Sequence, residues 1–263
     1  MSATADLDRW LEVAHALADL ADELTAPAFD AAAFDVAHKA DGTAVTEIDL
    51  AVERGLRAEL ERRLPDHAVL GEEDGLAGDP DAPCWVIDPI DGTTNFVKGN
   101  PVWATLIALR VEGEEVLGVA SAPALGARWD GAVGRGARRD GRSIVVSEVD
   151  RLADAEVSLG GLSYFVDAGR AGLLDAVATA TRRQRGYGDF WQHCLVAAGS
   201  TDVALEAEVN LWDLAAVRAI VEAAGGRFTS LEGVASADGG SAVSSNGRLH
   251  EEVLALVAAH RQA

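Results

Sequence analysis

Positive charge is scarce in this sequence. Its 263 residues include 22 Lys and Arg against 43 Asp and Glu, which gives a net charge of −21 at pH 7. Nucleic acids and anionic membranes bind basic surfaces, so this balance argues against both as partners. A phosphate substrate would also be repelled unless cations lay at its site, which is a first indication of metal chemistry. A role in solubility or salt tolerance explains the surface charge equally well.

Cysteine and long apolar runs are scarce too. Cys84 and Cys194, the two cysteines of the sequence, each lie in an apolar run, which favours buried reduced thiols over a disulfide or a redox pair. No apolar run approaches the roughly 18 residues of a membrane span. The stretch MSATADLDRW lacks the basic start and apolar centre of a signal peptide, so we expect a cytoplasmic protein.

The first half of the chain combines helix and strand patterns. Apolar residues at three- to four-residue spacing predict a helix over 7–24 that ends at Pro27, and Thr46 is expected to cap a second helix over about 47–64. Apolar runs predict a set of strands with a hairpin at Glu112-Gly113, over 84–89, 102–111, 115–123, 127–136 and 142–147. These elements suit an α+β arrangement.

The pattern changes after residue 149. Strands are expected over 155–161 and 201–207, and helices alternate with them over 171–183, 191–200, 211–226 and 250–260. Such alternation implies strands whose faces are covered by helices. We therefore expect two halves, 1–149 and 150–263, that form one integrated catalytic unit.

Carboxylates gather around one predicted strand, in the stretch GEEDGLAGDPDAPCWVIDPIDGTTNF. Asp88 and Asp91 flank an apolar pair at the end of the strand, and Glu72 precedes it. Carboxylates beside a buried strand repel one another and lose hydration, and a bound metal ion is the usual compensation. Mg²⁺ prefers oxygen ligands. The Ile90 carbonyl can add one, and Asp213 from the other half of the chain can close the cluster.

Each of these elements also has a simpler explanation. Asp213 and Asp49 can be acidic residues favoured by the dipole at a helix start. The segment from Asp88 to Gly92 can be a tight turn, and Glu72 can lie in a solvated loop. Their joint occurrence with a loop suited to phosphate favours the functional interpretation.

That loop is DGTTN. Gly92 allows the backbone to approach a ligand closely, and the amides of Gly92, Thr93 and Thr94 can point outward to bind phosphate oxygens. A Thr93 hydroxyl oriented by a carboxylate such as Asp49 could accept a proton from a metal-bound water.

The motifs GEE, DPIDGTTNF and WDLAA, in this order and spacing, resemble the signature set of the inositol monophosphatase-like, Mg²⁺-dependent phosphatases. The resemblance extends over nearly the whole chain, from KADGTAVTEID to GGSAVSSNG. It implies the fold of that family and of fructose-1,6-bisphosphatase, a layered αβαβα sandwich of the α+β class that is often a homodimer. It also implies a small phosphate monoester as the substrate.

The resemblance further assigns metal ligands. Glu72, Asp88 and the Ile90 carbonyl would hold a first Mg²⁺, and Asp88, Asp91 and Asp213 a second. Glu72 would also serve a third, looser ion, and Mn²⁺ is a possible substitute for Mg²⁺.

The remaining roles follow from the same resemblance. Gly92 and Thr93 would meet the phosphate, with Asp91 and Asp213 also facing the substrate. Thr93, Asp49 and Glu72 would form the catalytic set that activates the attacking water. Glu73 also matches the motif, and we expect it to support the metal ligands without binding the metal itself. Lys39 and Asp41 fall in a nearby loop without an assigned role.

The leaving group is the harder question, and the stretch from 185 to 216 bears on it. Glu206 lies where the family places a carboxylate that contacts substrate, and Asp189 adds a second acid. With Trp191 and His193 nearby, this set suits a leaving group that is cationic and flat, as in histidinol phosphate. Asp189 can instead cap a helix, Trp191 can be core, and His193 can be a satisfied buried residue.

The segments YGDF, NFVKGNPVWATLIAL and GGRFTSLEGV resemble the actinobacterial histidinol-phosphate phosphatases of the same family. The resemblance therefore implies hydrolysis of L-histidinol phosphate in histidine biosynthesis. Inositol-1-phosphate is the alternative substrate. A binding protein without turnover is disfavoured because all the motif carboxylates are present.

Overall fold

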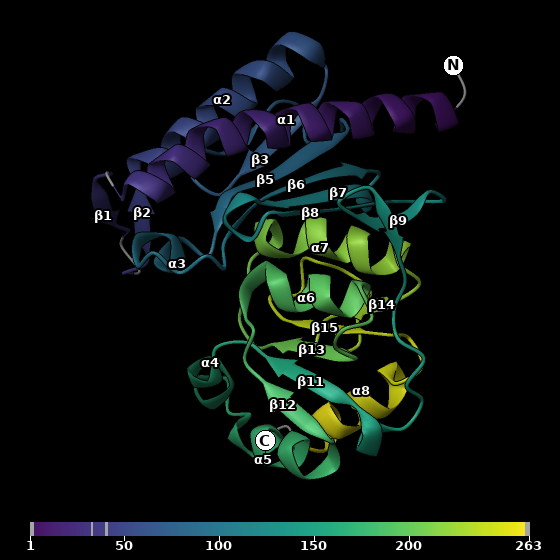
Figure 1. Ribbon diagram of the computed structural model, residues 1–263. Coiled ribbons are helices and arrows are strands. Elements are labelled where there is room, and N and C mark those ends of the chain that lie inside the picture. The colour runs from purple at the N-terminus through teal and green to yellow at the C-terminus, as the bar shows by residue number, and fades with distance from the viewer. Residues whose placement is uncertain (1–2, 33, 40–41, 261–263) are drawn as a thin grey trace.

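The computed structural model describes residues 3–32, 34–39 and 42–260 (Figure 1). Within these residues, the strands form a large first sheet in the order β10-β9-β8-β7-β6-β5-β3-β4, a second sheet in the order β12-β11-β13-β15-β14, and the separate pair β1-β2. The pair is β1 Val36–His38 and β2 Ala44–Thr46.

The strands of the two sheets have the following bounds. The first sheet contains β3 Ala68–Gly71, β4 Gly75–Ala77, β5 Cys84–Asp91, β6 Ala104–Val111, β7 Glu114–Ala122, β8 Ala127–Ala132, β9 Gly136–Arg139 and β10 Arg142–Ile144. The second sheet contains β11 Glu156–Leu159, β12 Arg183–Arg185, β13 Val203–Glu206, β14 Arg227–Thr229 and β15 Ala242–Ser245.

Helices cover and separate the two sheets, as Figure 1 shows. On one face of the first sheet lie α1 Ala3–Ala31 and α2 Glu47–Arg63, and between the sheets lie α6 Asp189–Ala197 and α7 Leu211–Ala223. The outer face of the second sheet carries α5 Ala171–Ala180 and α8 His250–Ala259, with the short α4 Leu162–Asp167 beside α5. This order of layers is the expected αβαβα sandwich.

Apolar side chains fill the spaces between the layers. Leu17, Leu56 and Trp85 pack between the first helical layer and the first sheet. Trp129 and Val217 belong to the cluster that packs α6 and α7 against the first sheet. None of the helices in the described part of the chain has the length and apolar character needed to cross a bilayer.

The two predicted N-terminal helices differ in outcome. The second is confirmed, because Thr46 caps α2 with its side chain and Asp49 completes a capping box. The predicted end at Pro27 is wrong, since α1 runs through that residue to Ala31. A proline removes only one backbone donor, and the last turn gains compensating contacts because Phe29 packs in a cluster of aromatic rings with Phe96 and Trp103.

The hairpin expected at Glu112-Gly113 is confirmed. These two residues join β6 to β7, and both have positive φ angles, of 53° and 85°. Two positive φ angles fit the right-handed twist of the paired strands. The division of the chain at residue 149 falls in the segment between β10 and β11 and stays a prediction.

Candidate active site

A bulge in β5 brings two aspartates to one side of the first sheet. Asp88 lies opposite Leu106 of β6 and Asp91 lies opposite Ala104, so three steps along β5 match two along its neighbour. Residues three apart in a regular strand face opposite sides, and the extra residue of a bulge cancels that alternation. The Thr105 hydroxyl donates to the Pro89 carbonyl at 2.7 Å within this bulge.

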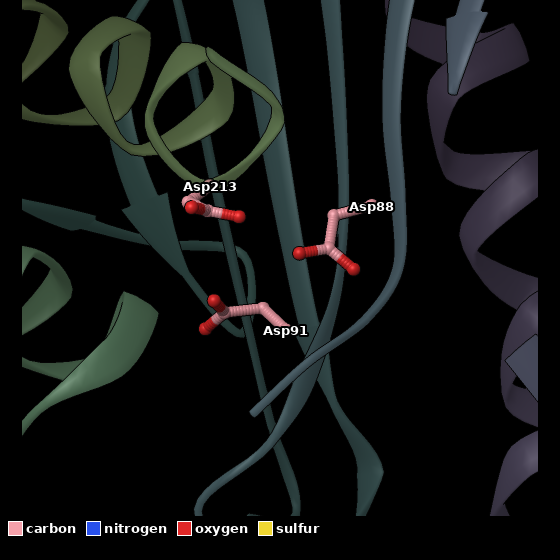
Figure 2. Close-up of side chains that lie close together, drawn as sticks. All are labelled: Asp88, Asp91 and Asp213. Atoms are coloured by element: carbon pink, nitrogen blue, oxygen red, sulfur yellow. The ribbon is translucent and has the colours of Figure 1, made fainter. Parts of the chain in front are cut away.

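Asp213 joins these two aspartates from the central helical layer. It lies in the first turn of α7, where its Oδ2 accepts the backbone N–H of Asn210 at 2.7 Å. Carboxylate oxygens of Asp88, Asp91 and Asp213, which we call the aspartate triad, all lie within 4.8 Å of one another. Figure 2 shows the three carboxyl groups turned toward a common space between β5 and the start of α7.

The triad is electrostatically unfavourable without a cation. Burial, reinforced by neighbouring carboxylates, holds the pKa values of Asp88 and Asp91 well above the usual range. Burial also raises the pKa of Asp213 to about 6. Among the described residues, no Lys or Arg forms an ion pair with these three groups. Clustered oxygen ligands with unbalanced negative charge fit a hard divalent metal ion.

Asp49 and Thr93 meet beside the triad. Oγ1 of Thr93 lies 3.2 Å from Oδ1 of Asp49 and 2.9 Å from the Ile90 carbonyl oxygen. The other oxygen of Asp49 accepts the N–H and the hydroxyl of Thr46 at 2.8 and 2.6 Å. Asp49 therefore caps a helix and faces the site at once, and burial raises its pKa.

Gly92 introduces the short helix α3 Thr93–Val97 directly after the last residue of β5. Its φ of 81° is one that favours glycine, and an added Cβ would lie 2.9 Å from the Val102 carbonyl oxygen. Gly92 and Thr93 both line the cavity that contains the triad. The backbone here can thus lie close to a ligand in that cavity.

Glu72 lines the same cavity but carries its own counter-charge. Nζ of Lys39 lies 2.6 Å from Oε1 of Glu72 and 2.8 Å from Oε1 of Glu73. Although burial opposes it, hydrogen bonding to these two glutamates raises the pKa of Lys39. Lys39 therefore offsets the negative charge of these two glutamates, which lie outside the triad. Asp41 lies outside the described residues.

The cavity has a volume of about 730 Å³ and also contains Asp189 and Glu206. Asp189 begins α6 with a φ of 48°, and the next amide, that of Phe190, donates to Oδ2 of Asp91 at 2.7 Å. Burial raises the pKa of Asp189 to about 6 and that of Glu206 to about 8. The second half of the chain therefore contributes two acidic groups to the cavity and a hydrogen bond to the triad.

The aromatic lining differs from the one expected. Trp191 packs edge-on against Tyr187, with ring centroids 5.4 Å apart, and does not line the cavity. Tyr164 and Trp212 line it instead. His193 lies in the wall, where its Nδ1 is 2.6 Å from the Ser244 hydroxyl and burial lowers its pKa to about 3. It is therefore a neutral, satisfied core residue.

Sequence reasoning missed three of the residues that shape this site. Asn95 belongs to the DGTTN motif, but only the structure shows its side chain bonded to Asp189. Tyr164 lies in a short helix without a clear periodic pattern. Gln192, buried on α6, contacts the Glu206 carboxylate through Nε2. Its position next to Trp191 gave no sign of that contact.

The model of the inositol monophosphatase family matches residues 6–262 of the sequence. The chain belongs to the inositol monophosphatase family. This membership agrees with the resemblance of the motifs and with the αβαβα layers. It also agrees with a metal-dependent site, because the residues that the motifs predicted as ligands include the aspartate triad.

Individual family members are similar along nearly their full length. A histidinol-phosphatase of Mycobacterium tuberculosis is 48% identical over 249 residues, which cover 93% of this chain and 96% of that protein. One of Streptomyces coelicolor is 47% identical over 258 residues, with coverage of 93% and 95%. The solved inositol monophosphatase of Anabaena has a TM-score of 0.86 at 26% identity and covers 97% of each chain.

Proposed function

We propose that this family member hydrolyses L-histidinol phosphate to L-histidinol and inorganic phosphate, as a metal-dependent phosphomonoesterase of histidine biosynthesis. The observation that carries the proposal is the presence of two further carboxylates, the half-buried Asp189 and the buried Glu206, in the cavity of the aspartate triad. Two histidinol-phosphatases share 48% and 47% of their aligned residues with this chain, which supports the same substrate.

In this proposal, the metal ligands are Glu72, Asp88, the Ile90 carbonyl, Asp91 and Asp213. They would hold two to three Mg²⁺ ions, with Mn²⁺ as a possible substitute. When bound, such ions neutralise the phosphate, lower the pKa of a coordinated water and stabilise the leaving alkoxide.

The protein's own groups supply the proton path and orientation. Oγ1 of Thr93 accepts a proton from the attacking water and passes its own to Oδ1 of Asp49, which lies 3.2 Å away. The raised pKa of Asp49 suits it to take that proton. Gly92 and Thr93 orient the phosphate.

Asp189 and Glu206 would select the leaving group. An ammonium that enters the cavity pairs with a carboxylate there and offsets the free-energy cost of holding its negative charge away from water. A hydroxyl carries no positive charge and offsets less of that cost. We assign the phosphate-binding motif and most of the metal ligands to the half 1–149. The half 150–263 would supply the substrate-selecting loop and the last metal ligand, Asp213. A cytoplasmic homodimer acting on this small molecule completes the proposal.

The test compares phosphate release from histidinol phosphate, inositol-1-phosphate and an aryl phosphate with Mg²⁺ at equal concentrations. We expect kcat/KM for histidinol phosphate to lead by at least about tenfold, equivalent to about 1.4 kcal/mol of transition-state discrimination. A lead for inositol-1-phosphate would instead assign Glu206 to hydroxyl recognition and make the alternative substrate the right one.

The double variant Asp189→Asn/Glu206→Gln sharpens this test. It should raise KM for histidinol phosphate and leave a neutral ester little affected, because only the former carries an ammonium. Equal losses on both substrates would contradict the selection of the amine by these two carboxylates.

A further inference from the structure

Two adjacent glycines at the end of β11 give room to two side chains of the cavity. A Cβ on Gly160 would lie 1.8 Å from Oε2 of Glu206, and a Cβ on Gly161 would lie 2.7 Å from Cδ2 of the Tyr164 ring. Both distances are far shorter than any contact between real atoms of these kinds. A carboxylate and an aromatic ring are thus packed directly on neighbouring backbone positions, and both line the cavity.

The Tyr164 ring contacts the chain along one edge and is otherwise open. Its edge lies against the backbone of Gly161, and the residue is still 44% exposed. Tyr164 and Gly161 line the same cavity as Asp213 and Trp212. The ring therefore offers a flat surface to a molecule whose phosphate lies at the triad, and the contact of its edge with Gly161 limits the directions that this surface can take.

We propose that Tyr164 is a specificity-determining residue whose ring binds the flat part of the leaving group, in the cavity that the carboxylate of Glu206 also lines. The inference rests on the proposed function, since histidinol phosphate carries an ammonium and an imidazole on one short chain. An aromatic face attracts a planar or cationic ring, while a carboxylate attracts an ammonium. Inositol has neither group, so the same wall disfavours it.

The experiment measures KM and kcat for Tyr164→Leu and Tyr164→Phe at saturating Mg²⁺. The substrates are histidinol phosphate and 2-aminoethyl phosphate, which has the ammonium but no ring. In the Leu variant, kcat/KM for histidinol phosphate relative to 2-aminoethyl phosphate should fall about tenfold, through KM. The Phe variant keeps the ring and should keep the wild-type ratio.

The matched control is Leu162→Ala. Leu162 lies on the same helix, is 55% exposed and does not line the cavity, so its variant should keep the wild-type ratio. An unchanged ratio in Tyr164→Leu overturns the proposal, as does an equal loss in Tyr164→Phe. Failure of the proposed function is a separate result, because wild-type protein would then show no preference for histidinol phosphate over inositol-1-phosphate.

Discussion

Nδ2 of Asn95 lies 2.8 Å from Oδ2 of Asp189, a residue 94 positions further along the chain. The same nitrogen donates its other hydrogen to the Val102 carbonyl oxygen, also at 2.8 Å. Asn95 thus ties the short helix α3 to the segment that begins α6. This hydrogen bond directs one oxygen of the Asp189 carboxylate toward α3.

Replacing Asn95 by Ala should raise KM for histidinol phosphate about tenfold, the typical effect of losing a hydrogen bond to a charged group. Steady-state kinetics with inositol-1-phosphate should show a smaller rise. In an Asp189→Asn background, the further change at Asn95 should not alter the ratio between the two substrates. Additive effects in this double-mutant cycle would mean that Asn95 acts independently of Asp189.

The exposed residue Asn100 provides the control. Its Nδ2 donates to Oδ1 of Asn95 at 3.0 Å, so Asn100→Ala removes a neighbour of Asn95 without removing the bond to Asp189. We expect the substrate ratio of this variant to match that of the wild type.

Glu53 is predicted to position Glu72, which we propose as a metal ligand. This fully buried carboxylate on α2 accepts the backbone N–H groups of Glu73 and Asp74 at 2.8 and 3.0 Å and pairs with Arg57. Glu53→Gln keeps the shape but loses the charge and one acceptor, so the turn that carries Glu72 loosens. The Mg²⁺ dissociation constant, measured by calorimetric titration, should rise about threefold to tenfold, a loss within the range for one hydrogen bond.

The exposed Glu61 of the same helix serves as the comparison for that experiment. Glu61→Gln removes one negative charge at the surface and should leave the Mg²⁺ affinity unchanged. Equal weakening in both variants would point to a general loss of negative potential rather than to the anchoring of the turn.

Asp213→Asn should stabilise the metal-free protein while it impairs activity. The substitution removes one of three mutually repelling carboxylates, and an amide can still accept the Asn210 N–H. Each kcal/mol gained raises Tm by about 2–4 °C for a chain of this size. Melting in the presence of a chelator should show such a rise, and turnover with Mg²⁺ should fall at least about a hundredfold.

An excess of Mg²⁺ should reverse that order of stability, because the wild type binds the ion more tightly than the variant. A lower melting temperature of the variant in chelator would show that the triad carboxylates stabilise the fold by themselves, contrary to the repulsion inferred from their pKa values.

Glu206 makes the stability of the metal-free protein dependent on pH. Burial raises its pKa from the ordinary 4.5 to about 8, so the folded state holds a proton that the unfolded state releases. The stability that this proton provides is fully present below pH 4.5 and is lost as the pH rises toward 8. The loss is on the order of a few kcal/mol, at about 1.4 kcal/mol for each pKa unit.

Melting curves recorded in chelator from about pH 5 to about pH 8.5, the range in which this group titrates, measure that loss. Glu206→Gln should flatten the fall of Tm, because the amide does not ionise. Parallel curves for the variant and the wild type would assign the pH dependence to other groups.

Local chemistry explains which parts of the fold were predictable. The cap at Thr46 and the hairpin at Glu112-Gly113 depend on a few adjacent residues, so the sequence predicts them directly. The end of α1 is decided by Phe29, whose contacts with rings from distant segments outweigh the local effect of Pro27. Such contacts leave no mark in the sequence near Pro27.

The same distinction applies to the site. The motif residues Asp88, Asp91 and Asp213 could be grouped from chemistry and family resemblance, and the structure brings them together. Trp191 was expected near the leaving group, but it packs against Tyr187, while Tyr164 and Trp212 line the cavity. The sequence did not show this, because it depends on contacts between segments. The role of Lys39 could not be assigned from the sequence either, because its ion pairs with Glu72 and Glu73 are seen only in the structure.

The position of α7 between the two sheets has a consequence during synthesis of the chain. Asp88 and Asp91 leave the ribosome more than a hundred residues before Asp213. The face of the first sheet that α7 covers is also made before that helix. From Leu214 to Val221, every residue of α7 is buried. Until the segment 211–223 has been made, the apolar face of the first sheet lacks the helix that covers it and the aspartate triad lacks its third carboxylate.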